Sequence, residues 1–122
     1  MGTNYLHSDI TGLIIKAYYN VYNILGYGFL EKIYEHAMLI ELKKLGLKCE
    51  SQKQVDVFYE NQNIGMYFAD IVVNNVVFIE LKAVETIAKT HEAQLVNYLR
   101  ATEIEVGLLL NFGKNRIIRN EF

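Results

Sequence analysis

The chain has 122 residues, of which 52% are hydrophobic and 21% are charged, and its formal net charge is −2. This length predicts a single domain over residues 1–122, and the apolar content suffices for a core and argues against intrinsic disorder. The net charge excludes a basic surface over the whole molecule, of the kind that many nucleic-acid-binding proteins carry, although local basic faces remain open.

The single cysteine, Cys49, excludes an intramolecular disulfide and a cysteine-rich zinc site, and it is typical of a reducing compartment. The first ten residues, MGTNYLHSDI, lack the basic and apolar regions of a secretory signal. No apolar run approaches the roughly 18 residues of a membrane span. We therefore expect a cytoplasmic protein with no membrane partner.

Two helices are predicted at the start of the chain. Apolar residues recur at helical spacing over residues 10–25, and Ser8 or Asp9 is the expected N-cap. The sequence GYG at residues 26–28 predicts a break. A second helix follows over residues 29–45, and Gly46 suits its C-terminal end.

The rest of the chain alternates between strands and one helix. Strands are predicted at residues 47–59, 64–73, 76–84 and 105–112, with a helix at 85–102 and a short edge strand or tail at 116–122. Asn74 and Asn75 indicate a tight hairpin turn, because asparagine tolerates positive φ. The order α-α-β-β-β-α-β favours an α/β fold around a mixed sheet, with residues 76–112 forming a right-handed parallel crossover.

Three polar side chains fall on the apolar sides of the predicted helices. On a helical wheel Glu31 lies between Met38 and Leu42, where a carboxylate needs a partner or a metal ion unless it reaches water at the edge of the face. Both interpretations of Glu31 are open. For Glu41, on the same broad face, a structural ion pair is favoured. Gln94, on the inward side of the last helix, is typical of a side chain bonded to a backbone carbonyl.

The predicted strands also carry charges that their apolar neighbours do not explain. Glu80 and Lys82 are two residues apart in one strand, so their side chains share a face of the sheet. Asp70 lies on the other arm of the same hairpin and is therefore near them. Carboxylate oxygens are the ligands that Mg²⁺ and Mn²⁺ require, and a nearby lysine can hold a water or stabilise negative charge on a phosphate. This set suits metal-assisted hydrolysis of a phosphodiester.

The same residues resemble a known pattern. An aspartate in AD, at Ala69–Asp70, followed across a hairpin by ELK, at residues 80–82, resembles the PD-(D/E)xK nuclease superfamily. GFLEKIY, from Gly28 to Tyr34, matches the signature of the GxxExxY protein family. AQLVNYL at residues 93–99 and VGLLLNFG at residues 106–113 are also similar to that family, so the resemblance covers about residues 10–112.

The resemblance implies a restriction-endonuclease-like αβββαβ core, preceded by an extra helix, and a nuclease that depends on Mg²⁺ or Mn²⁺. It implies that Asp70 and Glu80 are metal ligands, that Lys82 is the catalytic lysine that orients the attacking water, and that Glu31 is an additional acidic metal ligand. The main-chain carbonyl of Leu81 is a candidate for a further ligand.

Three other positions compare with the superfamily pattern. Gln94 and Tyr98 match a Q-x-x-x-Y element, which in related nucleases contributes to the active site or to the nucleic-acid-binding face. We therefore expect a catalytic role for Gln94 and a nucleic-acid contact for Tyr98. Ala69 stands where the motif has proline, a position that varies across the superfamily.

The hairpin supplies a geometric test. If Asn74 and Asn75 formed a strict two-residue loop, Asp70 would oppose Ile79 and would point away from Glu80. A shared site therefore predicts a three-residue turn, a bulge, or strands that diverge near Asp70.

Partners are inferred less directly. The expected substrate is nucleic acid, with DNA favoured over RNA, and the candidate phosphate contacts are Lys89, Lys114, Arg116 and Arg119, each of which could equally be a solvated surface charge. Apolar residues of the first helix could form a homodimer interface or pack on the core.

Two alternatives to a nuclease remain open. The first is a non-catalytic module that binds nucleic acid or protein on the same fold. The second treats Glu31, Glu80 and Lys82 as a structural ion-pair network.

Overall fold

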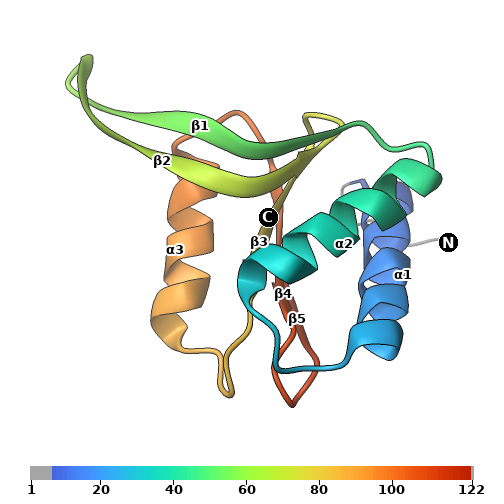
Figure 1. Ribbon diagram of the computed structural model, residues 1–122. Helices are drawn as coiled ribbons and strands as arrows, with labels where there is room; N and C mark the ends of the chain where they lie inside the picture. Colours follow the sequence, from blue (N-terminus) through green and yellow to red (C-terminus); the bar gives the residue numbers. More distant parts are fainter. Residues whose placement is uncertain (1–6, 122) are drawn as a thin grey trace, which may run out of the picture.

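The computed structural model describes residues 7–121 (Figure 1). Its elements are α1 (Ser8–Leu25), α2 (Glu31–Lys44), β1 (Cys49–Tyr59), β2 (Gln62–Val73), β3 (Val77–Lys82), α3 (Lys89–Arg100), β4 (Val106–Asn111) and β5 (Ile117–Glu121). The predicted order is confirmed, and the last segment is an edge strand. Among the described residues, no helix is both long and apolar enough to cross a membrane.

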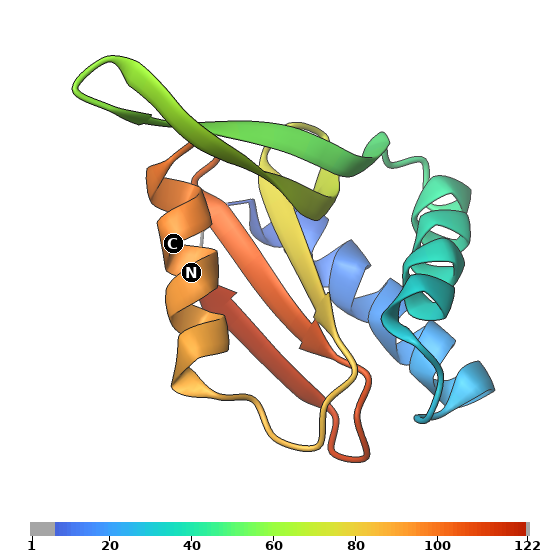
Figure 2. The ribbon, with the colours of Figure 1, turned by 60° about the vertical axis from the view of Figure 1, so that its left-hand side comes forward.

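The five strands form one sheet in the order β1-β2-β3-β4-β5. Strands β3 and β4 are parallel and are connected through α3, whereas the other three pairings are antiparallel. The sheet is therefore mixed, as the sequence predicts. The β1–β2 ribbon crosses the direction of the other strands, and its tip projects past α3 (Figure 2).

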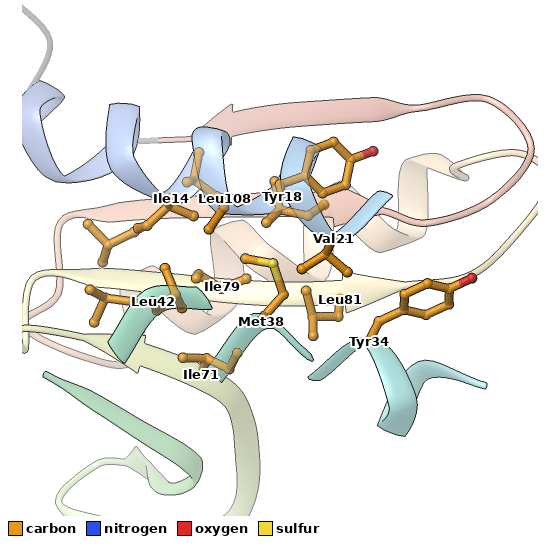
Figure 3. Packing of buried hydrophobic residues seen from close by; sticks show 14 of the residues in the cluster. Ile14, Tyr18, Val21, Tyr34, Met38, Leu42, Ile71, Ile79, Leu81 and Leu108 are labelled. Carbon is orange, nitrogen blue, oxygen red and sulfur yellow. The ribbon is translucent and has the colours of Figure 1, made fainter. Parts of the chain in front are cut away.

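Helices cover the sheet on both faces (Figures 1 and 2). Helices α1 and α2 bury Ile14, Met38 and Leu42 against Ile79 of β3 in the larger core (Figure 3). On the opposite face, Leu95 of α3 packs in a smaller core, whose members are Val55, Ala69, Val72, Phe78, Leu95 and Leu109. Because β3 contributes alternate residues to both cores, its sequence is an almost continuous apolar run.

The element boundaries lie within two residues of the prediction except at the start of α3, and the N-cap of α1 also differs. Helix α1 begins at Ser8, and its N-cap is His7 with a φ of 53°, so the expectation that Ser8 or Asp9 is the N-cap is wrong. Asp9 instead lies in the first turn, where its charge complements the helix dipole. Helix α3 begins at Lys89 rather than at residue 85, because residues 83–88 form a loop held against the end of β4.

The GYG segment fixes the start of α2 through Tyr34. The Tyr34 hydroxyl donates to the carbonyl of Gly26 at 2.6 Å and accepts from the backbone N–H of Phe29 at 3.2 Å. The Tyr34 ring stacks on Phe112 with centroids 4.3 Å apart. Gly28 has a φ of 114°, which other residues rarely adopt. The residues that define the GFLEKIY motif at its two ends therefore shape the loop before Glu31.

Asn111 fixes the loop that follows β3. Its buried side chain donates from Nδ2 to the carbonyl of Val84 at 2.8 Å and accepts at Oδ1 from the N–H of Val84 at 3.0 Å. Gly113 allows this close approach, since a Cβ there would lie 1.8 Å from the Val84 carbonyl oxygen. The chain leaving Lys82 is thus held by hydrogen bonds from the Asn111 side chain to the Val84 backbone rather than by a helix.

We predict that Asn111→Ala lowers the free energy of unfolding by about 2–4 kcal/mol, because both backbone polar groups of the half-buried Val84 lose their partner and the buried Asn111 side chain leaves a space. Urea denaturation measures the change. The control is Asn97→Ala, at an exposed position of α3, for which we expect a change within about 0.5 kcal/mol. Equal effects of the two variants would show that the hydrogen bonds between Asn111 and Val84 do not stabilise the fold.

Candidate active site

The β2–β3 hairpin places Asp70 opposite Glu80. The register pairs Val73 with Val77 and Ile71 with Ile79, so its continuation aligns Asp70 with Glu80. The loop holds three residues, 74–76, in which Asn74 and Asn75 have φ values of 51° and 57°. Of the three alternatives that a shared site predicts, the three-residue turn is the one found, and the two carboxylates approach each other as such a site requires.

Strands β2 and β3 separate at this point. Their ladder ends at the pair Ile71–Ile79, and the N–H of Leu81 donates to Asp70 Oδ2 at 2.8 Å instead of to a backbone carbonyl. In a sheet the N–H and C=O of one residue point to the same neighbouring strand. The Leu81 carbonyl therefore faces the same gap, while the Lys82 carbonyl accepts from Phe112 of the β4 side at 2.7 Å.

Glu80 is the least satisfied polar group of the site. Its residue is 7% exposed, and its Oε1 is buried without a hydrogen-bond partner within the described residues. Burial, reinforced by the negative charge of Asp70, raises the pKa of Glu80 to about 8. Burial also raises the pKa of Asp70, although the N–H of Leu81 and the amide of Gln52 oppose that shift. A bare carboxylate oxygen beside a second carboxylate fits a divalent cation.

Glu31 occupies the first position of α2, next to this pair but not within it. Its side chain is exposed, so of the two interpretations that the sequence left open the one in which Glu31 reaches water at the edge of the face is confirmed; it precedes the part of the helix that packs on the sheet. Its negative charge contributes to the raised pKa values of Asp70 and Glu80. Over residues 7–121, no three His, Cys, Asp or Glu side chains are close enough to hold a metal ion together, so Glu31 does not complete a three-carboxylate cluster.

Sequence reasoning missed two residues beside Asp70. Glu35 is 4% exposed, and its carboxylate accepts from Ser51 Oγ at 2.9 Å and from Gln52 Nε2 at 2.7 Å. Gln52 Nε2 also donates to Asp70 Oδ1 at 3.3 Å. Glu35 follows Glu31 by one helical turn, which is the only signal that could have found it. Nothing in the sequence marks Gln52.

Lys82 is half-buried on the strand that carries Glu80, and its positive charge opposes the rise in the Glu80 pKa. In the part of the chain that the structure describes, the ion pairs join Lys32 to Glu35, Lys44 to Glu41, Lys53 to Glu50 and Arg119 to Glu92. Neither Glu80 nor Lys82 takes part in any of them. The alternative of a structural network is thus contradicted at Glu80 and Lys82, whereas Glu41 has the ion pair that was predicted.

An aromatic pair adjoins the carboxylates. The rings of Tyr98 and Tyr67 stack with centroids 3.9 Å apart, and the Tyr67 hydroxyl donates to the Tyr98 carbonyl at 3.2 Å. Burial and the charge of Glu80 raise the pKa of Tyr98 to about 12. Gln94, one turn earlier, is exposed, so its predicted inward orientation is wrong: α3 turns Leu95 to the core instead.

The four basic candidates have different surroundings. Lys89, at the start of α3, and Lys114, in the turn between β4 and β5, are exposed. The Arg116 guanidinium lies 4.8 Å from the ring centroid of Tyr22 on α1, and Arg119 Nε is 2.7 Å from Glu92 Oε1. The two arginines therefore have partners within the fold, and the two lysines are the better candidates for phosphate contacts.

Comparison with known proteins gives the class. A sequence profile of the PD-(D/E)XK nuclease superfamily matches residues 8–121, and the chain belongs to this superfamily. Its nucleases generally use Mg²⁺ or Mn²⁺. The fold is likewise similar to the crystal structure of SSO0001, with a TM-score of 0.56 and 21% identity. That match covers 93% of this chain and 58% of the other, so this chain spans little more than half of its length. No curated protein sequence matches.

The raised pKa of Glu80 predicts a pH-dependent stability without metal. In the folded state Glu80 ionises near pH 8, compared with 4.5 for the ordinary group. The fold favours the neutral form of Glu80. Its contribution to the free energy of unfolding is therefore complete below pH 4.5 and is lost as pH rises to about 8. Glu80→Gln cannot ionise. We expect its free energy of unfolding, relative to the wild type, to rise by about 3 kcal/mol between pH 5.5 and pH 9.

Urea denaturation in EDTA at the two pH values measures this difference. Glu103→Gln, at an exposed position, is the control, and we expect it to follow the wild type at both pH values. A pH-independent effect of Glu80→Gln would show that the Glu80 carboxylate ionises normally in the folded protein.

Proposed function

We propose that the chain is a nuclease, dependent on Mg²⁺ or Mn²⁺, that hydrolyses phosphodiester bonds in nucleic acid. The observation that carries the proposal is the buried Glu80 carboxylate, which has an oxygen without a partner among residues 7–121 and lies beside Asp70 where the sheet opens. A fold without a ligand at this place gains nothing from such an arrangement, because an unsatisfied buried polar group is destabilising. A cation would satisfy both carboxylates.

Three groups of this chain would hold the ion: the side chains of Asp70 and Glu80 and the carbonyl of Leu81. Glu31, next to this pair, is proposed as a further acidic ligand, and its carboxylate adds negative charge at the edge of the site. Mg²⁺ and Mn²⁺ retain several waters, so three protein ligands are compatible with either ion. When bound, such an ion lowers the pKa of a coordinated water and stabilises negative charge on a phosphate.

Lys82 is the proposed catalytic lysine. Its ammonium group would donate a hydrogen bond to the attacking water and hold that water against the phosphorus atom. The water oxygen forms a bond to phosphorus and loses a proton to the solvent, while the bond from phosphorus to the leaving sugar oxygen breaks and that oxygen takes up a proton from the solvent. Gln94 would contact the substrate from the first turns of α3.

The substrate would be held by surfaces around these residues. A depression of about 440 Å³ is lined by Phe29 and Leu30 before α2, by Val84 after β3, and by Lys114. It therefore lies between the segment before Glu31 and the one after Lys82. The Tyr67–Tyr98 pair offers a surface on which a base could stack. With a net charge of −2, binding would rest on the metal, on Lys89 and Lys114, and on stacking, with DNA favoured over RNA.

Further parts of the proposal concern the family and the assembly. Gly28, Glu31 and Tyr34 carry the GxxExxY signature, and we assign the chain to that family within the superfamily. Ile24, with 77% of its area exposed on α1, would lie in a homodimer interface, while the remaining apolar face of α1 packs on the core. We also propose that the protein acts in the cytoplasm.

The proposal is tested by cleavage of a panel of DNA and RNA structures with Mn²⁺, Mg²⁺ or EDTA. We expect metal-dependent cutting by the wild type and a loss of about 10²-fold or more in Lys82→Ala, because the attacking water is no longer held. Lys16→Ala, at an exposed position of α1, is the matched control and should cut normally. No cutting by the wild type, with calorimetry also showing no Mn²⁺ binding, would favour a non-catalytic binding module.

A second prediction concerns the aromatic pair. Tyr98→Ala should weaken binding of single-stranded oligonucleotides about 5- to 100-fold, whereas Tyr98→Phe, which keeps the stacking face, should bind like the wild type. Fluorescence anisotropy in EDTA measures binding without cleavage. Tyr59→Ala, at the exposed tip of the β1–β2 ribbon, is the control. Equal binding by all three variants would exclude Tyr98 from the nucleic-acid interface.

A further inference from the structure

Gln52 occupies an irregular position in β1. The β1–β2 ladder pairs Ser51 with Ile71 and Lys53 with Ala69, but it is interrupted between them, at Gln52 and Asp70. Gln52 has a φ of 52°, in the left-handed region that residues other than glycine rarely adopt. Such strain persists only where the surrounding contacts maintain it.

Those contacts are two carboxylates on different elements. Gln52 Nε2 donates to Glu35 Oε1 on α2 at 2.7 Å and to Asp70 Oδ1 on β2 at 3.3 Å. Both partners only accept when ionised, and an amide nitrogen has two hydrogens to donate. The side chain of Gln52 therefore bridges two groups that would otherwise repel each other.

The bridge is anchored on its α2 side. The buried Glu35 carboxylate also accepts from Ser51 Oγ at 2.9 Å and lies 3.8 Å from Lys32 Nζ. With donors on several sides, Glu35 has a defined orientation, and it holds the Gln52 amide in turn. This anchor also ties the first turns of α2 to the sheet, and Glu31 is one turn before Glu35.

On its other side the bridge orients Asp70. Oδ1 of Asp70 accepts from Gln52, and Oδ2 accepts from the N–H of Leu81 at 2.8 Å. With a donor at each oxygen, the carboxylate plane is fixed relative to β3, and the lone pairs that these donors do not use remain available. Glu80, by contrast, has a buried oxygen with no partner among the described residues. A metal ion could supply that partner, whereas Asp70 is already oriented by donors of the protein.

We propose that Gln52 is a positioning residue, which uses Glu35 as its anchor and holds Asp70 in the orientation that binds the metal ion. The inference deepens the proposed nuclease function, on which it rests for the identity of the ion. Removing partners that orient a metal ligand typically lowers metal affinity by 10- to 100-fold. We expect a loss of about tenfold here, because Leu81 still holds one oxygen of Asp70.

The experiment uses the full chain with Gln52→Met, which keeps the length of the side chain but cannot donate, and Gln52→Gly, which suits the left-handed φ. Gln54→Met is the matched control. Gln54 is exposed on the same strand, and among the described residues its side chain hydrogen-bonds only to Asp56, at 3.0 Å. Calorimetry gives the Mn²⁺ affinity. NMR-detected hydrogen exchange of the Leu81 amide in EDTA reports on Asp70 without metal or substrate.

Both Gln52 variants should bind Mn²⁺ about tenfold more weakly, and the Leu81 amide should exchange several-fold faster, while Gln54→Met changes neither. Mn²⁺ affinity and Leu81 exchange within twofold of the wild type would overturn the proposal. If the wild type binds no Mn²⁺, the metal-positioning role is overturned together with the proposed metal site, and faster Leu81 exchange would then show only that Gln52 orients Asp70. A wild type that binds Mn²⁺ but cuts nothing would contradict the nuclease function and leave the role of Gln52 intact.

Discussion

The site depends on one hydrogen bond, between the N–H of Leu81 and the carboxylate of Asp70 at the point where β2 leaves β3. An ordinary ladder would fill this position with a backbone carbonyl and would close the sheet. Because a side chain takes that role, β2 turns away while β3 continues, and the gap receives Asp70, Glu80 and the carbonyl of Leu81. The placement of Asp70 beside Glu80 is thus a consequence of ending the β2–β3 ladder at the pair Ile71–Ile79.

The gap places charge where the fold would prefer apolar groups. Glu80 and Asp70 lie beside the smaller core, and burial raises the pKa of both. Their proximity reduces the stability of the apoprotein at neutral and high pH, since at least one carboxylate must ionise in a poor environment. A divalent cation bound there, as we propose, would reverse the sign of this effect, because a cation favours the ionised forms. Conflict of this kind between stability and local charge is expected at a functional site.

Two motif segments serve the site without touching a reacting group. Tyr34 holds the turn before α2, which brings Glu31 to the mouth of the gap. Asn111 holds Val84, which fixes the chain leaving Lys82. Both act through hydrogen bonds to backbone groups, which orient loops more strictly than side-chain packing does. Tyr34 and Asn111 thus support the site from a distance, and we propose a supporting role for Gln52 as well.

The sequence by itself determined the order of the elements, the mixed sheet and the presence of Asp70, Glu80 and Lys82 on one hairpin, because periodicity and spacing along the chain are local properties. The side on which Asp70 lies needed the tertiary structure, since one extra residue in the Asn74–Val76 loop reverses the face. The roles of Glu35 and Gln52 could not be predicted either, because their contacts join α2, β1 and β2. Nothing in the sequence indicates that a glutamine adopts a left-handed φ. The exposure of Gln94 was decided by how α3 rotates to bury Leu95, which depends on the packing of the whole sheet.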